Sequence, residues 1–343
     1  MEFLTSIIQF LKSLIIPGAI GSVCPGVSLD PPSTAVFLAN LSHSQLILLS
    51  IGSLLTLILL GIAATQWYYV WWFVSMEKRQ NMLYYLIMLL PFSACCSLVG
   101  MFIPRSAAMM TSIGIFYYFM CLFVLAALIR HLNDGRQNLV DYLKNQRRLI
   151  NLQSAPFCCF MWFLPQLEPS EMYLRILEWM VLQAPIVRML VVLSNVTAIC
   201  EFRESARHWF HWSDMGTVAS PMLAVFGIHT LARMTGEKLS KFRFMRIFRI
   251  VDMALFIFTA QQPLIFENIF VRFSIFECEP ILSPVDSAKF VCNFVIICEM
   301  LILSMIATRF ITPKHSELFD LFDKLAKEDA SDEALSIASI MDR

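Results

Sequence analysis

The side chains that could do chemistry in this chain are few, and they interrupt long apolar stretches. Arg188 and Glu299 each stand near the middle of such a stretch, and Asn195 follows Arg188 by seven residues. Ionisable groups are costly inside a bilayer, so they usually face a bundle interior or a wet cavity. Two hypotheses stay open: the guanidinium and the carboxylate pair and fix helix packing, or the guanidinium attracts an anionic solute.

Two glutamine–proline steps add polar groups to the same apolar stretches. They are Gln183-Ala184-Pro185 and Gln261-Gln262-Pro263. A proline inside a helix frees a backbone carbonyl and kinks the helix, and broken helices often line transporter sites. We therefore predict one set of substrate-binding residues: Arg188, Gln183, Asn195, Gln261, Gln262 and Glu299.

Enzymatic chemistry is not indicated by any motif. The six histidines are scattered, and the chain carries neither an HExxH pair nor a phosphate-binding P-loop. We expect no enzyme activity, no cofactor, no bound metal and no ATP-driven transport. The 26 basic residues balance the 26 acidic ones, so no global field favours nucleic acid.

The elements that must position these side chains are membrane-spanning helices. Of 343 residues, 58% are apolar and only 15% are charged, against roughly 25% charged in soluble domains. Seven continuous apolar runs approach or exceed the length of about 20 residues that a spanning helix needs. They cover residues 46–70, 83–103, 107–129, 176–200, 214–233, 247–271 and 288–311. The runs do not alternate as a β-barrel requires, so we predict an all-α bundle of seven transmembrane helices.

The basic residues predict the orientation of this bundle. With the N-terminus outside, nineteen of the 26 Lys and Arg residues fall in the cytosolic loops and tail, as the positive-inside rule requires. We expect an extracellular segment over 1–45, a transmembrane domain over 46–311 and a cytosolic tail over 312–343, with a short amphipathic helix at 315–327. Asn40 opens an Asn-Leu-Ser glycosylation sequon on the expected outer side.

The ten cysteines divide by this topology. Cys24 and Cys278 are the two in external segments, which predicts one disulfide between them. Cys158 and Cys159 lie in the long internal loop, beside an apolar stretch too short to span. That stretch is either an interfacial segment packed on the helix ends or a site where both cysteines carry palmitate.

Several local matches, in the same order along the chain, resemble the organic solute transporter alpha subunit. They are residues 31–35 (PPSTA), 103–106 (IPRS), 155–159 (APFCC), 259–266 (TAQQPLIF), Cys278, and Glu299 with Thr308 and Arg309. The resemblance covers about residues 24–309. It implies a seven-span, N-out subunit that works with a single-pass beta subunit.

The same resemblance implies facilitated, bidirectional movement of amphipathic anions such as bile acids and conjugated steroids. It places the chain among membrane lipids at the plasma membrane, with endomembranes and a homo-oligomer as open alternatives. Two other functions remain open: a seven-transmembrane receptor, and a scaffold that alters lipid composition or trafficking. The receptor is disfavoured because the third run ends in Ile129-Arg130-His131 and the seventh lacks an NPxxY pattern.

Overall fold

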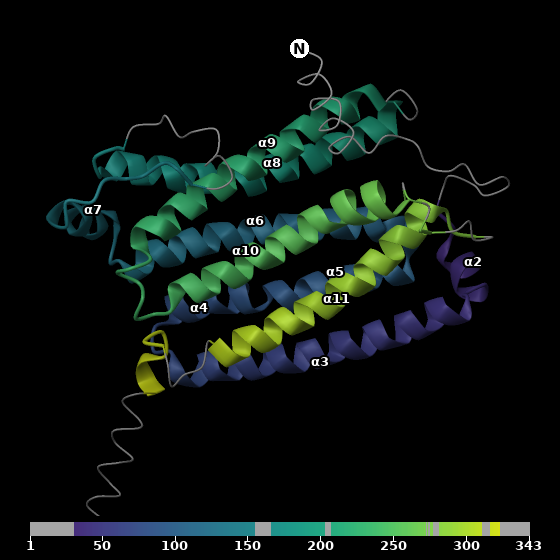
Figure 1. The fold of residues 1–343 in the computed structure, drawn as a ribbon, viewed down its shortest axis with the longest axis horizontal. Helices are drawn as coiled ribbons and strands as arrows, with labels where there is room; N and C mark the ends of the chain where they lie inside the picture. The colour runs from purple at the N-terminus through teal and green to yellow at the C-terminus, as the bar shows by residue number, and fades with distance from the viewer. Residues whose placement is uncertain are drawn as a thin grey trace, which may run out of the picture. The chain divides into compact units, whose positions relative to one another are not determined.

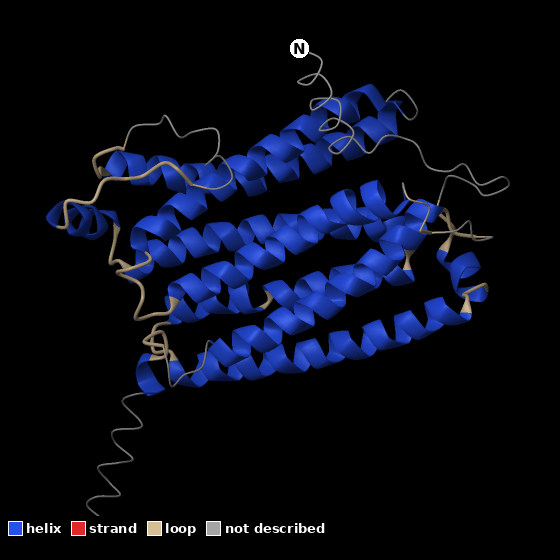
Figure 2. Cartoon of the chain, viewed as in Figure 1, coloured by secondary structure: helices blue, strands red, loops and turns tan. Residues whose placement is uncertain are grey.

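The structure, a computed structural model, describes residues 31–154, 166–202, 207–271, 273, 275–276, 281–310 and 316–322. Within these ranges the chain forms helices and one isolated bridge between Ile150 and Leu167 (Figure 1). Figure 2 shows how little of the described chain lies outside helices. The helices are α2 (Thr34–Ala39), α3 (His43–Phe73), α4 (Glu77–Ile87), α5 (Leu89–Phe102), η1 (Pro104–Ser106), α6 (Ala107–Leu132), α7 (Arg136–Asn145), α8 (Glu171–Phe202), α9 (Arg207–Thr235), α10 (Phe244–Gln261), η4 (Gln262–Val271) and α11 (Pro284–Phe310).

Six helical segments in the described part of the chain are long and apolar enough to cross a membrane. They are His43–Phe73, Glu77–Phe102, Pro104–Leu132, Glu171–Ala198, Phe244–Val271 and Pro284–Phe310. The predicted all-helical, multi-pass membrane protein is confirmed at this level. The remaining predicted run, the fifth (214–233), lies inside α9, which is equally long but carries Asp214, His229 and Arg233. Its crossing, and the orientation of both ends of the chain, stay predictions.

The observed helices extend past the predicted runs. The helix α3 begins three residues before residue 46 and ends three residues after residue 70, and α8 begins five residues before residue 176. A helix does not stop where the hydrocarbon core stops, because its backbone hydrogen bonds continue through the interface. The short helices α2 and α7 were not expected from the apolar runs.

A break divides the second predicted span. A turn at Met88 separates α4 from α5, and Pro91 explains it, because its ring clashes with the carbonyl of Ile87 and it has no N–H to donate. One turn before the break, the carbonyl of Tyr85 accepts a hydrogen bond from the Tyr117 hydroxyl at 2.9 Å. The proline that the sequence contains therefore interrupts this helix rather than only bending it.

Helices α8 and α9 form the tightest helix pair, and Figure 1 shows them side by side. Their close approach depends on small residues: Ala184 and Ala224 are almost fully buried, and Gly227 presents only hydrogen to α8. A Cβ added to Gly227 would lie 2.9 Å from the carbonyl oxygen of Leu177. Small residues at such positions let membrane helices approach backbone to backbone.

The chain divides into two compact units, which are described separately. Unit 1 comprises residues 1–63, 89–115 and 252–306, and unit 2 comprises residues 64–88, 116–251 and 307–343. In unit 1, α11 contacts α2, α3, α5 and α10, and its Phe290 ring lies 6.0 Å from the Phe37 ring of α2. Its Phe294 and Ile297 lie beside Gly52 of α3, its Asn293 lies beside Gly100 of α5, and its Glu299 meets α10.

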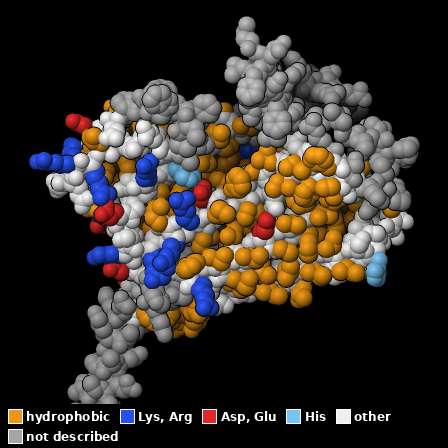
Figure 3. Space-filling model, viewed as in Figure 1, with side chains coloured by type: hydrophobic (Ala, Val, Ile, Leu, Met, Phe, Trp, Pro, Cys, Tyr) orange, Lys and Arg blue, Asp and Glu red, His pale blue; other side chains and the backbone are white. Residues whose placement is uncertain are grey.

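Unit 2 holds all four segments that were predicted to be cytosolic, and several of them contact one another. Arg148, after α7, forms an ion pair with Glu237, after α9, and Lys238 lies over the Tyr142 ring of α7 at 4.9 Å. Figure 3 shows Lys and Arg side chains gathered near the end where α7 lies. The basic loops therefore share one side, as the charge pattern predicts; which side of the membrane that is stays a prediction.

Candidate functional site

The candidate site in unit 1 is a polar cluster between α10 and α11. The amide nitrogen of Gln261 donates a hydrogen bond to Glu299 Oε1 at 3.2 Å. Both side chains are half-buried, and both lie in helical segments long and apolar enough to span a membrane. Two residues that the sequence predicted as substrate-binding are thus brought together, 38 positions apart in the chain.

This cluster contains two acceptors that its neighbours do not satisfy. Gln261 Oε1 and Glu299 Oε2 are buried, and neither accepts a hydrogen bond from the residues that the structure describes. A buried polar atom left without a partner costs about 1–3 kcal/mol. The cluster is therefore suited to receive a donor, such as a hydroxyl group, a proton or a water molecule.

The helix that carries Gln261 continues as a π-helix, η4, over ten residues. Pro263 explains the change of winding, because it has no N–H for the carbonyl four residues earlier and its ring crowds that carbonyl. In the wider turn, Gln262 donates to Glu267 Oε1 at 2.9 Å and Asn268 donates to the Pro263 carbonyl at 2.7 Å. Both pairs are five residues apart, the spacing that a π-helix brings onto one face; π-bulges are frequent at functional sites.

Sequence reasoning missed Glu267 and Asn268 as members of this cluster. The available signal was an acidic residue inside an apolar run, which is costly without a partner. The pairing of Gln262 with Glu267 was not foreseeable, because an α-helix would point residues five apart in different directions. The Gln262 amide nitrogen therefore already donates to Glu267, whereas the side-chain oxygen Oε1 of Gln261 accepts no hydrogen bond from the described residues.

A second polar pair lies in unit 2, where α8 meets α9. Gln183 Nε2 donates to the Ser220 carbonyl at 2.9 Å, and the Ser220 hydroxyl donates back to Gln183 Oε1 at 2.7 Å. Pro185 and Pro221 lie within two residues of this pair. Gln183, which the sequence predicted as a site residue, thus links α8 to α9 through hydrogen bonds. Its partner, Ser220, was not predicted.

Arg188 and Asn195 lie further along α8. Both are half-buried, and their spacing of seven residues places them on one stripe of the helix, as predicted. Asn195 Oδ1 is buried and accepts no hydrogen bond within the described ranges. Arg188 belongs to unit 2 and Glu299 to unit 1, so the expected pairing of these two charges stays a prediction.

Glu178 in unit 2 accepts hydrogen bonds from two arginines. Arg130 and Arg136 both donate to its Oε2, at 3.0 and 2.5 Å, and its side chain is only 14% exposed. The hydrogen bond from Arg136 to Glu178 raises the pKa of that guanidinium further. Three helices, α6, α7 and α8, are joined at this carboxylate, so Glu178 has a structural role rather than an exposed position at the interface.

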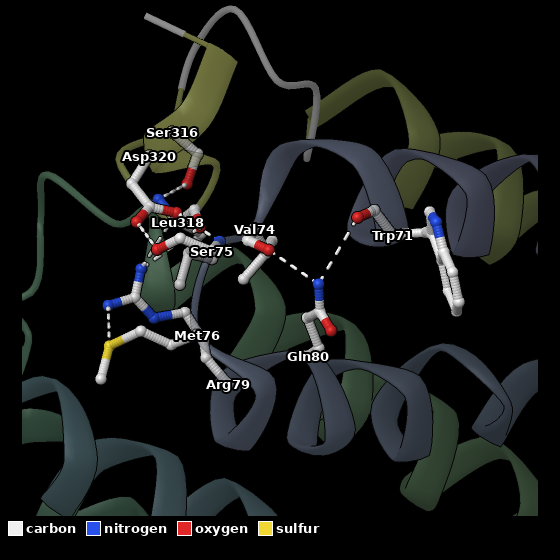
Figure 4. A network of polar contacts seen from close by, with 9 residues as sticks. All are labelled: Trp71, Val74, Ser75, Met76, Arg79, Gln80, Ser316, Leu318 and Asp320. Carbon is white, nitrogen blue, oxygen red and sulfur yellow. Dashed lines mark hydrogen bonds and ion pairs between the residues drawn. The ribbon is translucent and has the colours of Figure 1, made fainter. Parts of the chain in front are cut away.

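Part of the C-terminal tail, Ser316–Phe322, packs against two loops of unit 2, the one after α3 and the one after α9 (Figure 4). We call these residues the tail segment. Asp320 accepts hydrogen bonds from the backbone N–H and the hydroxyl of Ser75, and lies 3.7 Å from Arg79. Leu318 is fully buried, and the Ser316 hydroxyl donates to the Phe242 carbonyl at 3.0 Å. The predicted helix over 315–327 is wrong at residues 316–319, which form turns because their polar groups bond to other loops.

Neutralising Asp320 is expected to release the tail segment. Burial raises the pKa of this carboxyl, but the hydrogen bonds from Ser75 and the charge of Arg79 outweigh burial and leave the pKa lowered. A lowered pKa means that the contact is fully formed above the ordinary aspartate pKa of about 4 and is lost as the pH falls through the lower value. Asp320→Asn should reproduce that loss at neutral pH, at about 1–2 kcal/mol.

Hydrogen exchange of the peptide that contains residues 316–322 measures this release. Asp320→Asn should speed its exchange, together with that of residues 74–80. The exposed neighbour Glu317 provides the control, since Glu317→Gln removes the same charge without touching Ser75. Equal protection in Asp320→Asn and wild type would show that the ionised carboxylate does not hold the tail.

The remaining predicted site residues are placed as follows. Asn40 is exposed at the end of α2 and donates to the Val36 carbonyl at 2.9 Å, and its glycosylation stays a prediction. Cys24, Cys158, Cys159 and Cys278 lie outside the described residues, so the disulfide and the lipidation also stay predictions.

Comparisons with known proteins agree with the architecture. A family model described as "Organic solute transporter Ostalpha" matches residues 48–314. The chain is 46% identical over 293 residues to organic solute transporter alpha-like protein 3 of Caenorhabditis elegans, covering 85% of this chain and 84% of the relative. It is 31% identical to the alpha-like protein 1 of the same organism, over 85% of this chain and 75% of the relative. No solved structure matches the chain.

Proposed function

The chain belongs to the organic solute transporter alpha family, and we propose that it is the alpha-type subunit of a facilitative, bidirectional transporter for amphipathic anions. Bile acids and conjugated steroids are the proposed substrates. A single-pass beta-type subunit is the proposed partner, and the plasma membrane is the proposed location. Family membership supports solute transport in general, and the substrate class is argued from the polar groups within the helices.

The observation that carries the substrate proposal is the pair of unsatisfied acceptors, Gln261 Oε1 and Glu299 Oε2. Bile acids and hydroxysteroids carry hydroxyl groups on a rigid apolar ring system. A hydroxyl can donate to either acceptor and remove the cost of leaving it buried without a partner. The apolar faces of the helices around the cluster suit the ring system.

Arg188 is the side chain that we assign to the anionic group of the solute. Its planar guanidinium matches the oxygen geometry of a carboxylate or sulfate. Asn195, on the same stripe of α8, adds a short polar side chain. Gln183 and Gln262 contribute to binding only if their present hydrogen bonds to Ser220 and Glu267 open.

Uptake of a labelled sulfated steroid, in cells that express the chain with and without a beta-type partner, tests the proposal. We expect sodium-independent flux that requires the partner. Arg188→Ala should reduce this flux by about ten-fold or more at equal surface expression, the loss expected for a hydrogen-bonded charge. Arg188→Lys should retain part of the flux, since it keeps the cation.

Arg175→Ala is the matched control. Arg175 lies on the same helix but is exposed and forms an ion pair with Glu171, four residues earlier, so its loss should leave flux unchanged. Equal loss of flux in both variants would show that Arg188 is not the anion site, but the protein would still be a transporter. Absence of flux despite surface delivery of both subunits would favour a receptor, detectable as ligand-stimulated nucleotide exchange, or a membrane scaffold.

A further inference from the structure

A pocket of about 180 Å³ opens in unit 2, and none of its lining residues belongs to the polar cluster of unit 1. Its walls come from the end of α7, the loop that follows it, and the end of α9. The lining residues are Leu143, Arg148, Leu149, Asn151, Arg233 and Met234. The proposed transport function does not use any of them.

The polar groups of this pocket are donors. Within the described residues, the Arg233 guanidinium donates one hydrogen bond, to the Gln153 carbonyl at 2.7 Å, and Arg148 pairs with Glu237 through one terminal nitrogen. A guanidinium has five N–H groups, so each arginine keeps further donors. Asn151 accepts the backbone N–H of Gln153 with Oδ1 at 2.8 Å, which leaves its amide nitrogen to donate. Such a set suits an anion with several oxygens.

The other wall is apolar. Leu143 and Met234 are buried, whereas Leu149 is 49% exposed. An exposed leucine beside two arginines offers a surface for a hydrocarbon group next to a site for its charged end. A small inorganic anion would leave this apolar wall unused, so the lining fits an amphiphile better than a free ion.

The depth of the pocket points to a membrane lipid. Arg233 and Met234 stand at the last turn of α9. The predicted membrane run 214–233 ends at the same point, so that prediction puts the pocket at the level of the lipid head groups. The surrounding loops are basic: Lys144 and Arg147 are adjacent in sequence to lining residues, and Lys238 and Lys241 follow Met234 by four and seven residues. Basic pockets of this kind at helix ends bind phosphorylated lipid head groups.

We propose that this pocket binds the phosphorylated head group of an anionic membrane lipid. Arg148, Arg233 and Asn151 hold the phosphate oxygens, and Leu149 contacts the adjoining glycerol and acyl region. Glu237 competes with the phosphate for Arg148, because it forms an ion pair with that guanidinium.

Binding of dioctanoyl phosphatidylinositol 4,5-bisphosphate to the full-length protein in phosphatidylcholine nanodiscs tests this proposal. Arg148→Ala combined with Arg233→Ala should weaken binding at least about ten-fold, the loss expected for two charge-assisted contacts. Arg147→Ala is the control, since Arg147 is exposed, adjacent and absent from the lining. Replacing Arg148 and Arg233 together by Lys preserves the charge and should retain partial affinity, which separates lost contacts from lost folding.

Two further variants distinguish this site from general attraction to basic loops. Glu237→Gln should tighten binding by up to about five-fold, because it frees Arg148 from a surface ion pair worth at most about 1 kcal/mol. Leu149→Gln should weaken binding of the lipid but not of inositol 1,4,5-trisphosphate, which has no acyl chain.

Three outcomes would overturn the proposal. Equal loss in Arg147→Ala and in the double variant would show diffuse electrostatic attraction without a pocket. Inorganic phosphate that binds as tightly as the lipid would make this a site for a free anion. A sulfated steroid that displaces the lipid at equal concentration, with the same dependence on Arg148 and Arg233, would make the pocket part of the solute path.

Discussion

Replacing Gly227 with alanine is expected to destabilise the paired helices α8 and α9 more than its single methyl group suggests. The new Cβ would lie 2.9 Å from the Leu177 carbonyl oxygen and 3.2 Å from the Cβ of Met180. Backbone cannot move aside as a flexible side chain can, so the helices must separate. Overpacking of this kind costs about 1–3 kcal/mol, and separation also stretches the Gln183–Ser220 pair.

Gly216 provides the matched control on the same helix. A Cβ added there meets nothing within 4 Å, so Gly216→Ala should be neutral, or stabilising by up to about 1 kcal/mol through helix propensity. Thermal unfolding of the two variants in detergent compares the same chemical change at a crowded and at an open position. Equal melting temperatures would show that α8 and α9 do not depend on close approach at Gly227.

Replacing Glu299 with alanine is expected to remove most of the flux of a hydroxylated steroid conjugate. The substitution deletes the unsatisfied oxygen Oε2 and the partner of Gln261 together. A hydrogen bond to a charged group contributes about 1.5–3 kcal/mol, so flux at low substrate concentration should fall by about ten-fold to 100-fold.

Glu299→Gln separates the acceptor from the charge. Glutamine keeps one carbonyl oxygen and adds an N–H group that can satisfy Gln261 Oε1, so it should retain flux if the role is to accept a hydroxyl. Asp286→Asn is the control, because Asp286 is on the same helix but bonds to Ser283 and lies near Lys289. If Glu299→Gln fails as completely as Glu299→Ala, the negative charge, and not the acceptor, is required.

The sequence predicted the positions of the helices well because apolar run length is a local property. A run of about 20 apolar residues has no stable alternative to a helix in a membrane. Each of the six helical segments that are long and apolar enough to span a membrane contains or overlaps a predicted run. The fifth run, 214–233, is different because Asp214, His229 and Arg233 make α9 more polar. Composition alone therefore does not decide whether α9 crosses the membrane.

The candidate site was predictable only in part. Polar residues inside apolar runs identified Gln261 and Glu299, and these two do meet. Glu267 was missed because its partner, Gln262, comes onto the same face only in a π-helix. The sequence identified Pro263 as a residue that disturbs a helix. A proline can kink a helix, end it or change its winding, however, and packing decides which of these occurs.

What the sequence alone determined is therefore the membrane class, the helix positions and the list of polar residues held within the helices. Tertiary structure decided which of these residues meet: Gln183 with Ser220, Glu178 with two arginines, and Asp320 with Ser75. Such contacts depend on the rotation and relative depth of helices far apart in the chain. Those quantities follow from how side chains fit at every interface, and no local stretch of sequence carries that information.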